Sequence, residues 1–157
     1  MDYADSWQQD EAHELADTGA FDVIYGAGCH CAQPIENYNG TWIIYGLGNA
    51  VTESANTADT IVNNQGVTAR IQFAGKKGVA GSWRVNRIDW VPSANVAQGK
   101  YQWCSLASDH PDGPCWDETQ DANVRQRIWD VLYSMGADQN VVKEWNITAE
   151  RASSSGE

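Results

Sequence analysis

Hydrophobic and polar residues alternate along two stretches of the chain, and this period of two predicts β-strands with one buried face. The first stretch is residues 66–73, and the second is residues 82–91. A glycine-rich turn at residues 76–81 separates them, so we expect an antiparallel pair. The expected core face of the first strand consists of Val67, Ala69, Ile71 and Phe73.

Two shorter runs are apolar and are typical of short buried strands. They lie at residues 21–25 and 41–47. Between them, residues 33–38 are expected to be extended around Pro34. The dipeptide Asn39-Gly40 then predicts a tight hairpin turn into the second run.

Apolar residues at helical spacing predict helices near both ends of the chain. The first covers residues 10–17, with Ser6 as its expected N-cap. The second and clearest covers residues 116–135, and a short further helix is expected at 138–147. Helices mixed with strands predict an α/β (α+β) fold.

The composition fits one globular domain, expected over residues 1–150, followed by a disordered tail at residues 151–157. The 157 residues are 42% hydrophobic and 20% charged, which is enough to bury an ordinary core. The net charge of −11 argues against a nucleic-acid partner, because phosphate binding needs clustered Lys and Arg. No run of about 18 apolar residues predicts a membrane span, and the acidic N-terminus does not read as a signal peptide.

The four cysteines form two pairs with different expectations. Cys104 and Cys115 flank a polar loop that a disulfide closes easily, which would imply an oxidising compartment; the alternative is two unpaired thiols. Cys29 and Cys31 are two residues apart on an expected extended segment, where alternate side chains point to opposite faces. We therefore expect no disulfide between Cys29 and Cys31.

His30 lies on the tight turn after a buried strand, where a neutral imidazole is well placed to bind a divalent metal. One imidazole is not a metal site, since three or four ligands must converge, so a simple hydrogen-bonded role stays open. Glu36 could orient an imidazole or make a structural contact. His13, on the first helix, is expected to face solvent.

The run DVIYGAGCHCAQPIENYNGTWIIYGLGN, residues 22–49, resembles the closing segment of the CapA family of capsule and poly-γ-glutamate synthesis proteins. The family pattern is a D-x-V-I-G strand, an H-P-H turn, Q-P-I-E, an apolar strand and Y-S-L-G-N-F. This family belongs to the calcineurin-like metallophosphatase superfamily. The resemblance implies a partial α-β-β-α sandwich with C-terminal helices, covering the C-terminal part of the family's domain.

The resemblance also implies a site that this chain fills incompletely. The second His of H-P-H falls on His30, the metal-ligand candidate, whereas the first falls on Gly28, which has no side-chain donor. The Ser of Y-S-L-G-N-F falls on Gly46. The residues expected to line the site are Gln33, Glu36 and Asn49.

Intact relatives are implied to hold Mn, Fe or Zn, whereas we expect no cofactor and no catalysis in this chain. The upstream ligand motifs of the superfamily are absent from the sequence, so about half of the family's fold is expected, with an unpaired sheet edge. The chain would then fold as a reduced domain, pair with a missing half, or be a fragment. The implied location is the cell surface.

Three functional hypotheses follow. The first is a CapA-like protein linked to capsule or poly-γ-glutamate synthesis or export. The second is a non-catalytic binding or assembly module that pairs with a capsule-synthesis partner or forms a homo-oligomer. The third is a mononuclear zinc site built from Cys29, His30 and Cys31 with a fourth group such as His110.

Overall fold

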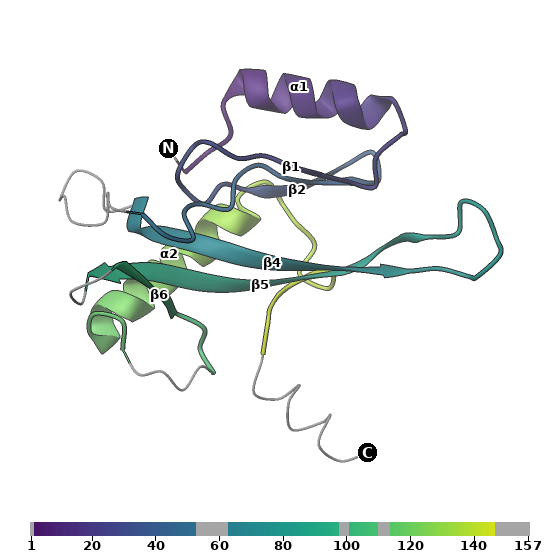
Figure 1. Cartoon of the computed structure of the whole chain (residues 1–157). Helices are drawn as coiled ribbons and strands as arrows, with labels where there is room; N and C mark the ends of the chain where they lie inside the picture. The colour runs from purple at the N-terminus through teal and green to yellow at the C-terminus, as the bar shows by residue number, and fades with distance from the viewer. Residues whose placement is uncertain (1, 53–62, 98–100, 110–113, 147–157) are drawn as a thin grey trace, which may run out of the picture.

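The computed structural model describes residues 2–52, 63–97, 101–109 and 114–146. Within these ranges the chain forms two helices and two β-sheets, which confirms the expected α+β fold class (Figure 1). The expected tail at residues 151–157 and the fourth ligand of the zinc hypothesis, His110, lie outside the described residues.

The first helix, α1 (Ser6–Asp17), is longer than the sequence pattern predicts. Ser6 is its first helical residue rather than its cap. Asp5 holds the N-cap position, and its backbone N–H donates a hydrogen bond to Gln8 Oε1 at 3.0 Å. Gly19, with a φ of 67°, ends the helix in the left-handed conformation that glycine adopts without a steric penalty.

The first sheet contains β1 (Val23–Tyr25), β2 (Ile35–Tyr38) and β3 (Thr41–Ile44), in the order β1-β3-β2. β1 runs parallel to β3, and β2 runs antiparallel to it. The predicted hairpin turn is confirmed: Asn39 and Gly40 have φ values of 51° and 93°, as a type I′ turn requires. This order leaves β1 at one edge of the sheet.

The second sheet is built on the long antiparallel pair of β4 (Gln65–Ala74) and β5 (Arg84–Ala97), as the alternation predicts. β6 (Tyr101–Ser105) pairs antiparallel with the C-terminal part of β5, and β7 (Val142–Glu144) pairs parallel with its N-terminal part. The helix expected at residues 138–147 is therefore wrong. Val142 is fully buried against β5, and this strand pairing outweighs the weak helical preference of a short segment.

α2 (Glu118–Tyr133) completes the main core. It begins after Asp117, whose side chain accepts a hydrogen bond from the Gln120 backbone N–H at 2.8 Å. The main core joins the lower face of the first sheet, the second sheet and α2 through residues that include Ile44, Trp42, Ile88, Trp90, Ile128 and Leu132. A separate small core beneath α1 contains Ala4, Ala12, Ile43 and Tyr45. The central strand of the first sheet, β3, is thus buried on both faces.

The disulfide between Cys104 and Cys115 is confirmed, with a Cα–Cα distance of 5.9 Å. It ties the end of β6 to the segment that leads into α2. In the part of the chain that the structure describes, no helix is long and apolar enough to cross a membrane.

Candidate functional site

The turn between β1 and β2 places His30 beside Asn49. His30 has a φ of 58°, a conformation uncommon for a residue other than glycine. Its Nδ1 lies 2.9 Å from Asn49 Oδ1. A side-chain partner on one ring nitrogen fixes the orientation of an imidazole, which is how second-shell groups hold metal-binding histidines. The other nitrogen, Nε2, is then the one available for a ligand.

Asn49 is itself fixed by β4, β5 and the residues just before β4. Its side-chain amide donates to the Asn63 carbonyl at 2.9 Å, and its backbone carbonyl accepts a hydrogen bond from Asn95 Nδ2 at 3.1 Å. Its backbone N–H donates to the Gln65 carbonyl at 3.2 Å. The Asn49–His30 contact therefore lies where the chain passes from the first sheet to β4.

Gln33 is buried behind the same turn, with an exposed fraction of 2%. Its Nε2 donates to the Tyr3 carbonyl at 2.7 Å and to Gln8 Oε1 at 3.2 Å. Gln33 thus fastens the turn to the segment before α1 and to α1 itself. It also lines, together with Cys29, a cavity of about 410 Å³.

Glu36 does orient an imidazole, but the imidazole is that of His13 and not that of His30. Glu36 Oε2 lies 3.0 Å from His13 Nε2 and accepts a hydrogen bond from the Tyr45 hydroxyl at 2.7 Å. The His13 ring stacks on Tyr38 with centroids 3.7 Å apart. The expectation that His13 faces solvent is therefore wrong: the periodicity of α1 could not reveal its partners, since they come from the β2–β3 hairpin.

The Cys29 side chain folds back onto the backbone of Cys31. The positive φ of His30 turns the chain between them, so the segment is not extended as the sequence suggested. The Cys29 thiol donates a hydrogen bond to the Cys31 carbonyl oxygen at 3.0 Å. Neither cysteine forms a disulfide, as expected. The hydrogen bond from Cys31 lowers the pKa of Cys29 to about 6 and raises that of Cys31, which acts as donor.

Two cavities open on this turn. The first, of about 400 Å³, lies between Gly26–His30, Leu47–Ala50 and the start of β4. The second is the 410 Å³ cavity that Gln33 lines, on the α1 side of Cys29. Cys29 lines both cavities.

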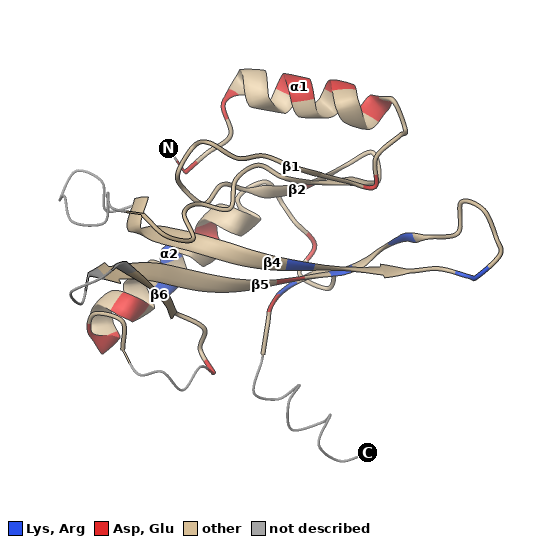
Figure 2. Cartoon of the chain, in the orientation of Figure 1, with Lys and Arg blue, Asp and Glu red and all other residues tan. Residues whose placement is uncertain are grey.

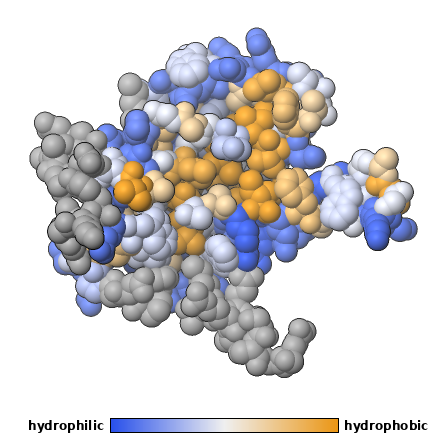
Figure 3. Space-filling view, in the orientation of Figure 1, coloured by the Kyte–Doolittle hydropathy of each residue, from blue (hydrophilic) through white to orange (hydrophobic). Residues whose placement is uncertain are grey.

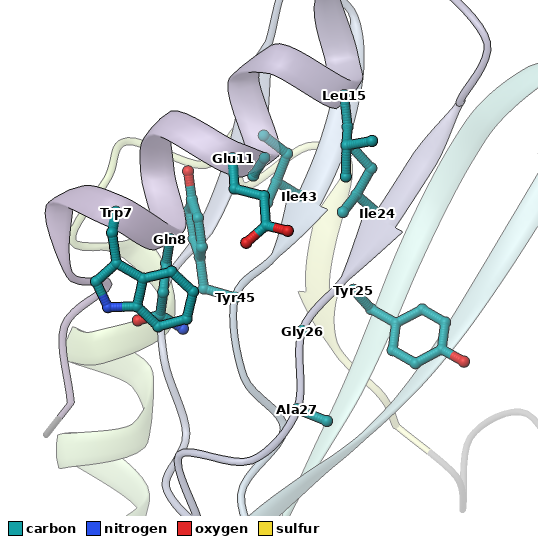
Figure 4. A pocket seen from close by; sticks show the side chains of 11 residues that line it. Trp7, Gln8, Glu11, Leu15, Ile24, Tyr25, Gly26, Ala27, Ile43 and Tyr45 are labelled. Carbon is teal, nitrogen blue, oxygen red and sulfur yellow. The ribbon is translucent and has the colours of Figure 1, made fainter.

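A third cavity, of about 240 Å³, lies between α1 and the free edge of β1 (Figure 4). Trp7, Leu15 and Tyr25 line it, and all three are exposed. The Glu11 carboxylate points from α1 into this groove. Figure 3 shows hydrophobic surface gathered beneath α1 on the face that contains this edge.

The side chains present do not fit a catalytic metal. Among the described residues, no three His, Cys, Asp or Glu side chains converge into a possible metal site. Gly28 contributes no donor and its φ of 101° suits glycine. Glu36 is engaged by His13 and Tyr45 instead of facing His30.

Comparisons with known proteins show what part of this chain resembles. Residues 1–54 match the family described as bacterial capsule synthesis protein PGA_cap, so this part of the chain is similar to that family. The chain is 38% identical over 84 residues to the PGA biosynthesis protein CapA of Bacillus subtilis (strain 168). That alignment covers 52% of this chain and 20% of the relative, so the matched part is about a fifth of the relative's length. No solved structure matches the chain significantly.

Proposed function

We propose that this chain serves the synthesis or export of a poly-γ-glutamate capsule without carrying out metallophosphatase chemistry. The observation that carries the proposal is the arrangement around His30. Its imidazole is held by Asn49 in the manner of a metal ligand, while position 28 offers no second donor. A two-metal phosphatase site needs several ligands that clamp both ions and the attacking water. One oriented imidazole cannot supply these.

The proposed location is the cell surface. The Cys104–Cys115 disulfide supports it, because disulfides persist in oxidising compartments and are rare in a reducing cytosol. The acidic composition is compatible with an extracellular protein that works beside an anionic polymer without binding it by charge.

The experiment combines metal content, hydrolysis and genetic complementation. Purified protein is incubated with Mn, Fe or Zn, dialysed, analysed for bound metal and assayed on an aryl phosphodiester. We expect less than stoichiometric metal and no hydrolysis. In a deletion strain of the source organism that has lost surface poly-γ-glutamate, wild type and His30→Ala should restore the polymer equally. Hydrolysis that His30→Ala abolishes, or failure of only His30→Ala to complement, would overturn the non-catalytic assignment.

A second candidate function is an assembly module that pairs through the edge of β1, and a specific observation favours it. β1 has β3 on one side and, among the described strands, no partner on the other. Alternate residues of a strand bond the same neighbour, so Val23 and Tyr25 direct their backbone groups outward, whereas Ile24 faces β3. Such an edge accepts an added strand.

The occupant proposed for this edge is an extended segment of a partner protein with alternating apolar and basic residues. Apolar side chains would enter the groove beside Trp7 and Leu15, and a basic one would meet Glu11. The acidic residues of α1, which Figure 2 shows along the helix, favour a basic partner over a second copy of this acidic chain. A peptide of this pattern should bind wild type. Val23→Pro, which removes an outward backbone N–H, and Glu11→Lys should each weaken binding. Concentration-dependent dimerisation without peptide binding would contradict this choice and favour a second copy.

A further inference from the structure

The outer end of the β4–β5 hairpin projects beyond both sheets and both helices (Figure 1). We call residues 72–84 the β4–β5 arm; all of them are exposed except Ser82, which is partly buried. Ile71, whose strand partner Ile88 is fully buried, marks its base. At about 3.3 Å a residue, the distance from Ile71 to the turn at Gly78 is about 20 Å. The arm therefore ends well clear of the folded body.

The β4–β5 arm is basic although the chain has a net charge of −11. Residues 60–88 contain no Asp or Glu, and Figure 2 shows blue positions along the hairpin. Five of the ten Lys and Arg of the chain lie here, namely Arg70, Lys76, Lys77, Arg84 and Arg87. Arg70 and Arg87 face the buried Asp89, so the two lysines and Arg84 are the charges of the outer part. The Debye length is about 8 Å at physiological ionic strength, so the negative charge of the body is largely screened at the turn.

Three apolar side chains of the arm are exposed as well. The exposed fractions are 45% for Phe73, 45% for Val79 and 51% for Trp83. The Trp83 ring lies against Gly75 on the other side of the hairpin, where an added Cβ would be 2.6 Å from its Cδ2. The ring is thus positioned by the glycine while about half of the residue stays open to solvent. Exposed tryptophan and aliphatic side chains beside lysines are typical of segments that lie in a membrane interface.

The turn of the arm hydrogen-bonds its own backbone. The Val79 N–H donates to the Lys76 carbonyl at 3.1 Å. The Ser82 hydroxyl accepts from the Lys76 N–H at 2.9 Å and donates to the Val79 carbonyl at 2.8 Å. Backbone groups without partners are costly to transfer out of water. The turn can therefore enter a lipid headgroup layer with these groups already satisfied.

We propose that the β4–β5 arm docks on an anionic lipid surface. Lys76 and Lys77 meet the lipid phosphates, while Val79 and Trp83 enter the interface beneath them. The combination of charge and apolar surface favours this occupant. A soluble anionic polymer would pair with the lysines but offers no apolar layer for Trp83. A second copy of the chain would bring two strongly acidic bodies together.

The experiment measures binding of the full chain, with its Cys104–Cys115 disulfide intact, to sedimented lipid vesicles. One set contains equal parts of phosphatidylglycerol and phosphatidylcholine, and the other contains phosphatidylcholine alone. Wild type should bind the anionic vesicles at least about tenfold more tightly, and added salt should weaken this binding. Lys77→Glu and Trp83→Ser should each weaken it about tenfold. Brominated phosphatidylcholine in the anionic vesicles should quench wild-type tryptophan fluorescence more than that of Trp83→Phe.

Two matched variants control for general effects, and circular dichroism confirms that every variant is folded. Lys143→Glu makes the same charge change at an exposed site on β7, and Trp103→Ser removes a tryptophan that is 41% exposed on β6. Both should bind within about twofold of wild type.

Three outcomes would overturn the proposal. The first is that wild type does not bind the anionic vesicles. The second is that Lys143→Glu weakens binding as much as Lys77→Glu, which would show an effect of net charge alone. The third is retention on immobilised polyglutamate that Lys77→Glu abolishes, with vesicle binding unchanged in Trp83→Ser, which would identify an anionic polymer as the occupant.

Discussion

The Tyr45 hydroxyl donates a hydrogen bond to Glu36 Oε2 at 2.7 Å, and this contact links the last part of the first sheet to the residue that holds His13. Tyr45 is 3% exposed, so its hydroxyl has exchanged water for one carboxylate oxygen. Burial, followed by the hydrogen bond to Glu36, raises the pKa of Tyr45 above its ordinary value.

Tyr45→Phe should therefore lower the free energy of unfolding by about 1–2 kcal/mol at neutral pH. The unfolded tyrosine ionises near pH 10, whereas the folded one keeps its proton to a higher pH. The stabilising contribution of the Tyr45 phenol is thus complete below about pH 10 and is lost as the pH rises further. Urea titrations from pH 7 to 11 should show wild type losing stability more steeply than Tyr45→Phe above pH 10. Parallel curves for the two proteins would contradict this account.

Replacing Glu36 should cost more than replacing His13. Glu36→Ala leaves the buried Tyr45 hydroxyl without its acceptor, and a buried unsatisfied group costs about 1–3 kcal/mol. His13→Ala leaves the Tyr45–Glu36 bond in place and removes a partly buried contact with Glu36 and a ring stack, which we expect to cost about 1 kcal/mol. Chemical denaturation of both single variants and the double variant measures the coupling. Equal losses of stability in the two single variants would indicate that water replaces Glu36 as the acceptor for the Tyr45 hydroxyl.

Much of the fold could be predicted because its signals are local. The type I′ turn at Asn39-Gly40 and the alternation along β4 and β5 each follow from neighbouring residues. β7 could not be predicted, since its pairing with Ile88–Trp90 depends on a contact more than 50 positions away in the chain. Short segments follow such tertiary contacts rather than their own preference.

The candidate site shows the same division. The pairing of His30 with Asn49 joins two motifs that the sequence already singled out. The Cys29–Cys31 contact was missed, because it depends on the positive φ of His30, which a non-glycine residue rarely adopts. The sequence left open whether Glu36 orients an imidazole or makes a structural contact, since no local pattern shows that α1 presents His13 to the β2–β3 hairpin.

Two glycines of the site should respond differently to alanine. At Gly46 an added Cβ would meet Gln33 Oε1 at 2.8 Å as well as Cys29 Sγ at 2.7 Å, so Gly46→Ala should cost about 1–3 kcal/mol through overpacking. At Gly28 nothing lies within 4 Å of such a Cβ, and only the φ of 101° opposes alanine, at about 1–2 kcal/mol. Gly46→Ala should also alter thiol labelling at Cys29, whereas Gly28→Ala should not move the sulfur. The same labelling change in both variants would contradict the explanation that a Cβ at position 46 displaces the Cys29 sulfur.

Asp89 is the buried charge on which the second sheet depends. Its side chain is 1% exposed, and Arg70 Nη2 donates to Oδ2 at 2.7 Å, while Arg87 pairs with the other oxygen. Arg70 also stacks over Trp145, with its Cζ 3.9 Å from the ring centroid. Asp89→Asn removes the charge that two guanidinium groups face, and we expect a loss of about 3–5 kcal/mol. Thermal and urea unfolding measure the loss, with exposed Asp130→Asn as control, expected within about 0.5 kcal/mol of wild type.

Removing the Cys104–Cys115 disulfide should destabilise the chain through its unfolded state. The bond closes a loop with a sequence separation of 11, and a loop of this size is expected to contribute about 2–3 kcal/mol. Cys104→Ser with Cys115→Ser should lower the urea midpoint by the corresponding amount. Since Cys115 is buried and its sulfur lies 3.3 Å from the Ser105 carbonyl oxygen, Cys115→Ala in the double variant separates loss of packing from loss of the crosslink. Addition of a strong reductant should lower the urea midpoint of wild type to that of the variants. A wild type whose stability does not change on reduction would mean that Asp121, which accepts hydrogen bonds from the Cys115 and Trp116 N–H groups, holds this loop without the bond.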